Sequence, residues 1–253
     1  SMVAGLTDRG YQDYAVEAAI SKVFATECVW RTLDESLQVA GGTGYMSEYP
    51  YERLMRDCRI NRIFEGTNDI LRLFIALTAM NDVGTQLKEV AQSLGKVLQD
   101  PIKGFGVLSE YARKRVSYAT GFGKATMTQA HPAIKQEAEV FEDCTKKLAS
   151  FVDKLLRKYG KQIVGQQFAT RRLADIMIDL FALACVISRV TSAIEEKGVE
   201  ATRREQEIVK VFAGQVSRRV RSNFNKIDEN DDEEIISLAK DAVEREGYGW
   251  DTL

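Results

Sequence analysis

The sequence has few residues that interrupt helices and few of the patterns that mark metal sites. Its 253 residues include only three prolines, and they are rich in residues that favour helices. One histidine and four cysteines without CxxC spacing indicate neither a zinc site nor a disulfide framework. The most apolar run, Ile176 to Ile187, contains Asp179 and is too short to cross a bilayer. We therefore expect an all-α protein with buried helices and no bound metal.

An excess of charge of one sign is also absent. Lys and Arg number 35 against 37 Asp and Glu, so the net charge is -2, which gives no reason to expect nucleic acid as a partner. Ser1 and Met2 resemble a cloning remnant, and the next residues lack the basic start and apolar core of a signal peptide. We expect the chain to begin inside a longer protein.

Apolar residues recur at helical spacing in much of the chain. Gly41 and Gly42 are expected to stop the first helix in a left-handed conformation. Thr67 or Asn68 is expected to cap the helix that begins near residue 69. The later helices are expected to form an antiparallel bundle. The predicted helices span residues 13–40, 51–55, 57–64, 69–81 with a possible extension to 94, 133–159, 163–197, 202–223 and 233–246.

A glycine-rich segment between about residues 100 and 132, with mostly positive charges, predicts a domain boundary. We divide the chain into a helical domain (1–100), a basic linker (101–132) and an additional helical domain (133–253). The linker has the composition of a segment that lies on an anionic membrane surface, with Lys and Arg facing phosphate. A solvated connector between two domains is the other interpretation.

Glu65 lies between two apolar stretches and is followed by a glycine. If Ile63 and Phe64 enclosed it in an apolar pocket, loss of water would make its carboxylate a stronger base. Gly66 would let a ligand approach the backbone closely. The simpler interpretation is an acidic residue that compensates the dipole of the following helix. The spacing alone is compatible with both.

Several segments resemble acyl-CoA dehydrogenases. Residues 59–72 (RINRIFEGTNDILR) resemble the most diagnostic signature of that family. Residues 38–45 (QVAGGTGY) are similar to its flavin-contacting turn, residues 17–24 to the helix before that turn, and residues 51–59 fill the interval. The four segments occur in the family's order and spacing.

The resemblance implies an acyl-CoA dehydrogenase C-terminal helical bundle in which Glu65 is the catalytic base. Glu65 would take the α-proton of a fatty acyl-CoA while the β-hydrogen leaves as hydride to FAD, giving a trans-2-enoyl-CoA. Gly66 would border the thioester. The implied flavin contacts are Thr67, Asn68 and Asp69 and, toward the flavin of a neighbouring subunit, Gln38, Val39, Ala40, Gly41 and Gly42.

The chain continues past Glu65 for a further helical domain, as in the very-long-chain branch of the family. Residues 131–132, 167–175, 178–181 and 187–189 resemble this branch and its relative, the complex I assembly acyl-CoA dehydrogenase. Residues 49–53 resemble the relative more closely, and we favour the very-long-chain branch. This branch implies mitochondrial β-oxidation, peripheral binding to the matrix side of the inner mitochondrial membrane, a homodimer, and electron transfer flavoprotein as the acceptor.

The family's amino-terminal helical domain and middle β-domain are expected to carry most flavin and acyl-CoA contacts, and neither is in this sequence. We therefore expect the chain alone to be inactive and to bind flavin poorly. An alternative of a different class is a non-catalytic helical module for dimerisation, membrane docking or respiratory complex I assembly, in which Glu65 is unused.

Overall fold

The computed structural model describes residues 2–80 and 127–247. Every regular element in these two ranges is a helix, which confirms the predicted all-α class. Most of the predicted basic linker (101–132), with its membrane-surface interpretation, lies outside the described residues, as does the possible continuation of the helix to residue 94. Among the described helices, none combines the length and apolar content that crossing a bilayer requires.

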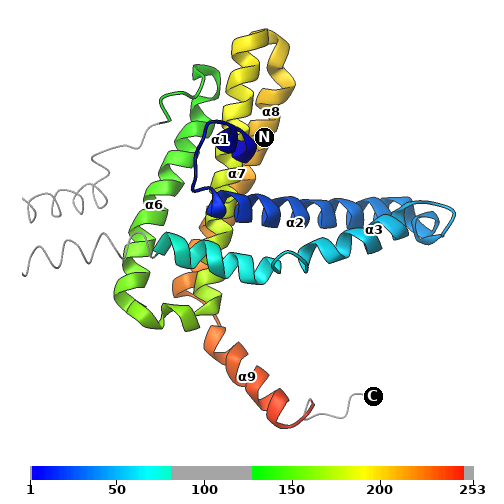
Figure 1. Ribbon diagram of the computed structural model, residues 1–253, viewed down its shortest axis with the longest axis vertical. Helices are drawn as coiled ribbons and strands as arrows, with labels where there is room; N and C mark the ends of the chain where they lie inside the picture. The colour runs from blue at the N-terminus through cyan, green and yellow to red at the C-terminus, as the bar shows by residue number, and fades with distance from the viewer. Residues whose placement is uncertain (1, 81–126, 248–253) are drawn as a thin grey trace, which may run out of the picture.

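Three long helices form the predicted antiparallel bundle. They are α6 (Lys135–Tyr159), α7 (Gln167–Lys197) and α8 (Arg203–Asp228), and they lie side by side in Figure 1. The apolar run that begins at Ile176 lies inside α7, where Ile176 and Leu183 are fully buried. They pack in one cluster with Val209 and Val216 of α8. The run is therefore a buried helix segment, as the sequence predicts.

A second unit of the fold is a helical arm. Helix α2 (Ala15–Ala40) packs against α7 and then projects away from the bundle, and α3 (Tyr51–Arg59) returns alongside it (Figure 1). Gly41, with φ of 59°, ends α2 as predicted and begins a short 3-10 turn, η1 (Gly41–Tyr45). The buried residues of α2, Ala19, Ile20 and Val23, all lie in its first half. The outer half of the arm is therefore largely uncovered by the described part of the chain.

The helix over residues 68–80 follows the arm and completes a core that both predicted domains share. Ile75 is fully buried and belongs to one cluster with Ile20 and Val23 of α2 and with Leu155 and Leu173 of the bundle. Apolar burial contributes about 25 cal/mol per Å². The arm and the bundle are therefore held together by a common hydrophobic core.

Some predicted helix bounds are wrong, for identifiable reasons. The two predicted pieces at 51–55 and 57–64 are one helix, α3, followed by a 3-10 turn, η2 (Ile60–Arg62), so Phe64 is not helical. Helix α7 begins at Gln167 instead of 163, because a 3-10 turn (Gly160–Gly165) precedes it. Helix α8 continues past residue 223, because Phe224 packs on Phe151 and Ile227 is buried. The helix α1 (Met2–Asp8) was not predicted.

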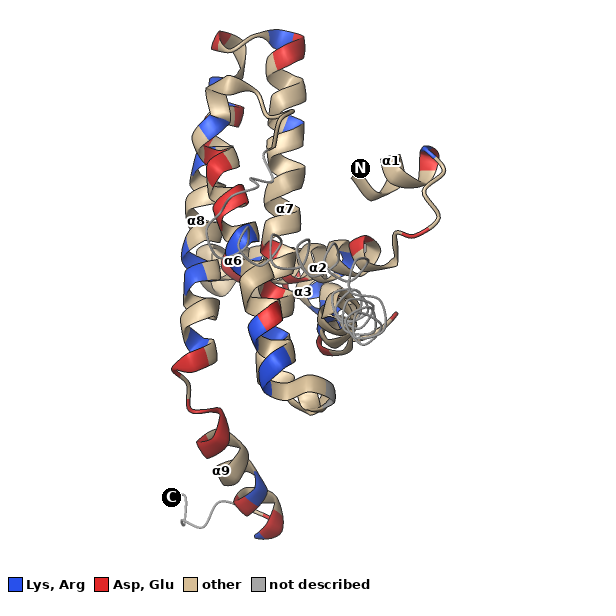
Figure 2. Cartoon of the chain, turned by 90° about the vertical axis from the view of Figure 1, so that its left-hand side faces the viewer, with Lys and Arg blue, Asp and Glu red and all other residues tan. Residues whose placement is uncertain are grey.

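The last helix, α9 (Asp232–Glu244), extends away from the bundle and buries no residue (Figure 1). Acidic residues fill its first turn, as Figure 2 shows, and oppose the positive end of the helix dipole. Asp232 also accepts two hydrogen bonds from Arg172 of α7, at 2.6 and 2.5 Å. This ion pair ties the start of α9 to the bundle.

Candidate functional site

The loop that carries Glu65 runs from residue 63 to 67 and has an unusual backbone. Glu65 has a φ of 54° and Gly66 a φ of 88°, so two consecutive residues are left-handed. A side chain with a Cβ costs about 1 kcal/mol in this conformation. Thr67 then starts the next helix: its Oγ1 accepts a hydrogen bond from the amide of Ile70 at 3.2 Å. The predicted cap is therefore Thr67, and the left-handed Glu65 must be held by its surroundings.

A buried amide lies directly under this loop. Asn68 is 2% exposed, and its Oδ1 accepts a hydrogen bond from Lys22 Nζ at 2.8 Å. Its Nδ2 donates to Glu27 Oε1 at 2.9 Å and to Thr26 Oγ1 at 3.0 Å. Lys22 Nζ also donates to the carbonyl oxygen of Gly66 at 2.8 Å. Three residues of α2 thus fix both the start of the helix and the peptide group next to Glu65.

Glu27 contacts residues on both sides of the loop. Arg62, just before it, lies 3.3 Å from Glu27, and Arg72, after it, lies at 3.5 Å. Burial raises the pKa of Glu27, but the hydrogen bond from Asn68 and the charges of Arg62 and Arg72 outweigh it and lower the pKa below its ordinary value. The carboxylate of Glu27 therefore clamps the two ends of the loop while it stays ionised.

The lowered pKa of Glu27 predicts a pH dependence of stability. A carboxyl with a depressed folded-state pKa stabilises the fold above its unfolded pKa, and this contribution is lost as the pH falls through the folded value. The free energy of unfolding can be measured by urea denaturation at pH 6 and again below pH 4. We expect it to fall less between these two conditions in Glu27→Gln than in the parent. Equal losses in the two proteins would contradict the assignment.

The described residues do not form an apolar pocket around Glu65. Ile63 is 51% and Phe64 48% exposed, and Glu65 is itself exposed. The reason is that the loop lies on the outside of the arm, while its polar anchors face inward. Within the described residues, Ile63 and Phe64 therefore do not enclose the carboxylate, and this interpretation would require a cover from elsewhere.

Gly66 is required by its backbone conformation and by a close neighbour. A Cβ at this position would lie 3.2 Å from Cδ2 of Leu71, and the φ of 88° is strained for any side chain. We expect Gly66→Ala to lower the free energy of unfolding by about 1 to 2 kcal/mol, measured by urea denaturation. Gly165→Ala is the control, because its φ is not positive and a Cβ there has open space. A loss of equal size in both variants would contradict the explanation.

The second predicted group, residues 38–42, lies at the far end of α2. Gln38, Val39, Gly41 and Gly42 are exposed. Lys22 contacts the Glu65 loop, and Gln38 follows it by sixteen residues of the same helix. The distance between them along the helix axis is about 24 Å, at 1.5 Å per residue. Within one chain, the structure therefore does not bring residues 38–42 together with Glu65.

The turn at residues 41–42 nevertheless suits a ligand that approaches the backbone closely. A Cβ built on Gly41 or Gly42 would meet no atom within 4 Å. Beside this turn, a hollow of about 740 Å³ is lined by Val39, Tyr51 and residues of α2. The amide of Gly41 donates to the carbonyl oxygen of Gln38, so what the turn offers a ligand is the open space beside its two glycines.

The three residues after Gly66 differ in what they offer a ligand. Asp69 is exposed and lines a hollow of about 310 Å³ against the start of α7, which includes Arg171. Thr67 is half-buried and its hydroxyl caps the helix. The side chain of Asn68, predicted as a flavin contact, instead points into the protein, where its oxygen and nitrogen already have partners. Asn68 therefore positions the loop.

Sequence reasoning missed the anchors of the loop, Lys22, Thr26, Glu27, Arg62 and Arg72. One signal was available, because Glu27 follows Val23 by four residues and Ile20 by seven, which places it on the apolar face of α2. A charged residue on such a face requires a partner.

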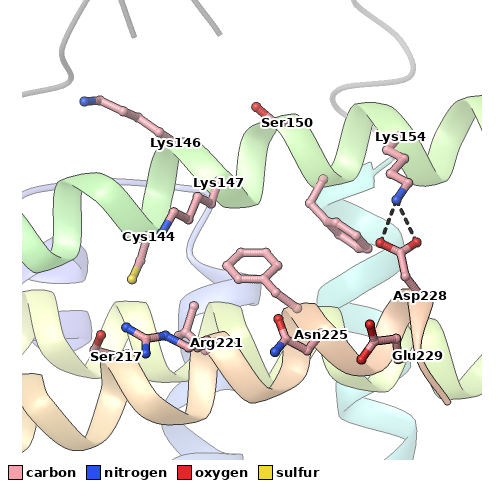
Figure 3. A pocket seen from close by; sticks show the side chains of 13 residues that line it. Cys144, Lys146, Lys147, Ser150, Lys154, Ser217, Arg221, Asn225, Asp228 and Glu229 are labelled. Atoms are coloured by element: carbon pink, nitrogen blue, oxygen red, sulfur yellow. Dashed lines mark hydrogen bonds and ion pairs between the residues drawn. The ribbon is translucent and has the colours of Figure 1, made fainter. Parts of the chain in front are cut away.

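A further hollow of about 650 Å³ lies between α6 and α8, and no predicted site residue lines it. Figure 3 shows Lys147 of α6 and Arg221 of α8 on its sides and the ion pair between Lys154 and Asp228 at one end. Phe151 and Phe224 meet edge to face within it, with ring centroids 5.7 Å apart. It is separate from the loop of Glu65.

The structure joins an anchored carboxylate loop, an exposed glycine turn and a helical arm to a bundle, and family models match both halves of the chain. The model described as "Acyl-CoA dehydrogenase, C-terminal domain" matches residues 2–80. The model described as "ACAD9/ACADV, C-terminal domain" matches residues 132–248. The chain therefore belongs to the acyl-CoA dehydrogenase family and corresponds to its C-terminal part.

Individual relatives agree with this assignment. The mitochondrial very long-chain specific acyl-CoA dehydrogenases of Rattus norvegicus and Homo sapiens are each 36% identical over 97% of this chain. A probable acyl-CoA dehydrogenase of Bacillus subtilis is 32% identical over 89% of it. The chain spans only 38% of the length of the two mammalian relatives. The crystal structure of a Bacillus anthracis acyl-CoA dehydrogenase complexed with FAD is 26% identical, with a TM-score of 0.63 over 84% of this chain and 32% of that one.

Proposed function

We propose that this chain is the C-terminal part of an FAD-dependent enzyme that oxidises long- or very-long-chain fatty acyl-CoA, and that Glu65 is its catalytic base. The observation that carries the proposal is the left-handed Glu65 on a loop anchored at both ends by Glu27. Strained residues persist only where the surroundings hold them, and they cluster at functional sites. The family membership gives this carboxylate its chemistry.

Glu65 takes the α-proton of the acyl thioester as the β-hydrogen leaves with its electron pair, and the product is a trans-2-enoyl-CoA. The bound flavin supplies the acceptor for that hydride. Because a thioester α-proton is only weakly acidic, the carboxylate must lose water to become a strong enough base. The exposed Ile63, Phe64 and Ile70 provide an apolar border for this purpose. We propose that parts of the whole enzyme outside this chain cover that border.

The residues that would hold the flavin fall into two groups. Thr67 and Asp69 lie beside the base, and Gly66 is placed to border the thioester of the substrate. Residues 38–42 lie about 24 Å away along α2, so we propose that they contact the flavin of a second subunit. This arrangement requires at least a homodimer for a complete site.

The names of the relatives guide the remaining assignments. We propose a mitochondrial enzyme of fatty acid β-oxidation, because the mammalian relatives are named mitochondrial very long-chain specific acyl-CoA dehydrogenases. We also propose electron transfer flavoprotein as the acceptor and peripheral binding to the inner membrane, which the resemblance to the very-long-chain branch implies.

The test is to join this chain to the missing part of its enzyme and compare the parent with Glu65→Gln. Anaerobic mixing with palmitoyl-CoA should bleach the flavin absorbance of the parent and leave that of the variant oxidised. Unchanged reduction in Glu65→Gln would contradict the proposal and favour a non-catalytic helical module. The isolated chain is expected to be colourless and unreactive, and a yellow chain that palmitoyl-CoA bleaches would contradict that expectation.

A further inference from the structure

We propose that the C-terminal bundle positions the base of the proposed reaction through the ion pair between Asp175 of α7 and Arg72. This inference rests on the proposed role of Glu65. A continuous series of hydrogen bonds runs from α7 through the 68–80 helix and α2 to the peptide group next to Glu65. The bundle is thereby a part of the catalytic framework.

The first link joins the bundle to the helix after the loop. Arg72 Nε donates to Asp175 Oδ1 at 2.7 Å, across 103 residues of sequence. The Arg72 side chain is largely buried, so the ion pair is less screened by solvent than a surface pair. The neighbouring carboxylate on α7, Asp179, is held by Arg219 of α8 at 2.7 to 3.1 Å. Asp175 is thus presented to Arg72 by a rigid part of the bundle.

The next links carry the connection to the loop. Arg72 lies 3.5 Å from Glu27 and donates to the carbonyl oxygen of Asn68 at 3.4 Å. Glu27 accepts from the amide of Asn68, and the oxygen of that amide accepts from Lys22. Lys22 ends the series at the carbonyl of Gly66, adjacent to the base.

Arg72 is shared between two carboxylates that come from the two halves of the chain. Glu27 attracts it toward α2 and Asp175 attracts it toward α7, across a cleft of about 410 Å³ that all three residues line. Without Asp175, Arg72 would shift toward Glu27, which also binds Arg62 and Asn68. Because Glu65 is held against its own backbone preference, a small change in these anchors would release the loop.

Backbone amide exchange in the whole chain tests this directly. We expect Asp175→Asn to speed exchange at residues 63–68 about fivefold. Asp232→Asn is the matched control, because it removes the same charge from another ion pair of α7, with Arg172, that includes none of the residues anchoring the loop. Unchanged loop exchange in Asp175→Asn, or an equal increase in Asp232→Asn, would overturn the proposal. Arg72→Lys should also speed exchange, because lysine keeps the charge but not the arrangement of donors.

The flavin-loaded whole enzyme provides a second, kinetic readout. In single-turnover mixing with palmitoyl-CoA, Asp175→Asn should lower the limiting rate of flavin reduction about fivefold and leave substrate affinity unchanged. Asp175→Glu should restore part of the rate. A change in affinity alone, or no rescue, would overturn a positioning role. If Glu65→Gln still reduced its flavin, the proposed base would be wrong, whereas the exchange experiment would still decide whether Asp175 anchors the loop.

Discussion

Glu65→Gln in the whole enzyme is expected to slow flavin reduction by bound acyl-CoA about 10³-fold, because a positioned general base contributes about 10² to 10⁴ in rate. Glutamine keeps the size of the side chain and loses its ability to accept the α-proton. Substrate binding should change little, since glutamine fills the same space as glutamate. Rapid-mixing absorbance of the flavin measures the rate, and titration of the oxidised enzyme measures the affinity.

Two comparisons separate chemistry from backbone strain in this experiment. Glu246 has the same φ of 54° but follows α9, so Glu246→Gln should leave the reduction rate unchanged. Glu65→Gly removes the carboxylate and the strain together, and should gain about 1 kcal/mol in stability while losing the reduction. If Glu65→Gly kept the parent's rate, the carboxylate would not be the base.

Asn68→Leu is expected to lower the free energy of unfolding of the chain by about 2 to 3 kcal/mol, because it removes hydrogen bonds from a buried amide to charged groups. Leucine has a similar shape, so little cavity forms. It cannot accept from Lys22 or donate to Glu27, so both hydrogen bonds are lost. Urea denaturation followed by circular dichroism measures the loss.

Asn225→Leu on α8 is the control for this substitution. Asn225 is exposed, and the change there should alter stability by no more than about 0.5 kcal/mol. Equal losses in the two variants would mean that Asn68 has no special role. A large loss in Asn68→Leu and a small one in Asn225→Leu would support the explanation. If Lys22→Met reproduced part of the loss, the hydrogen bond between Lys22 and Asn68 would be one of its causes.

Helical periodicity predicted most of this architecture, because local patterns determine where helices form. Residues 13–40 and 133–159 became α2 and α6 within two residues of the expected bounds. Thr67 was one of two expected caps, and it caps the helix. His131, the only histidine, caps a turn by accepting from the amide of Ala133 at 3.1 Å. All these features depend on residues close in sequence.

The interior of the candidate site could not be predicted in the same way. Asn68 is buried because Lys22 and Glu27, more than forty residues earlier, supply partners for its amide. The ion pair between Arg72 and Asp175 spans 103 residues. Helical periodicity concerns residues a few positions apart, so it cannot reveal such contacts. The exposure of Glu65 could not be predicted from its apolar neighbours either, since Ile63 and Phe64 are themselves exposed among the described residues.

The common core of the arm and the bundle has an evolutionary consequence. Ile75 and Val23 lie on one side of the junction between the two matched family segments, and Leu155 and Leu173 on the other, yet they fill one interior. A descendant that deleted the later segment would open this interior to water. A shorter protein that kept only the first segment would need other residues to seal that surface.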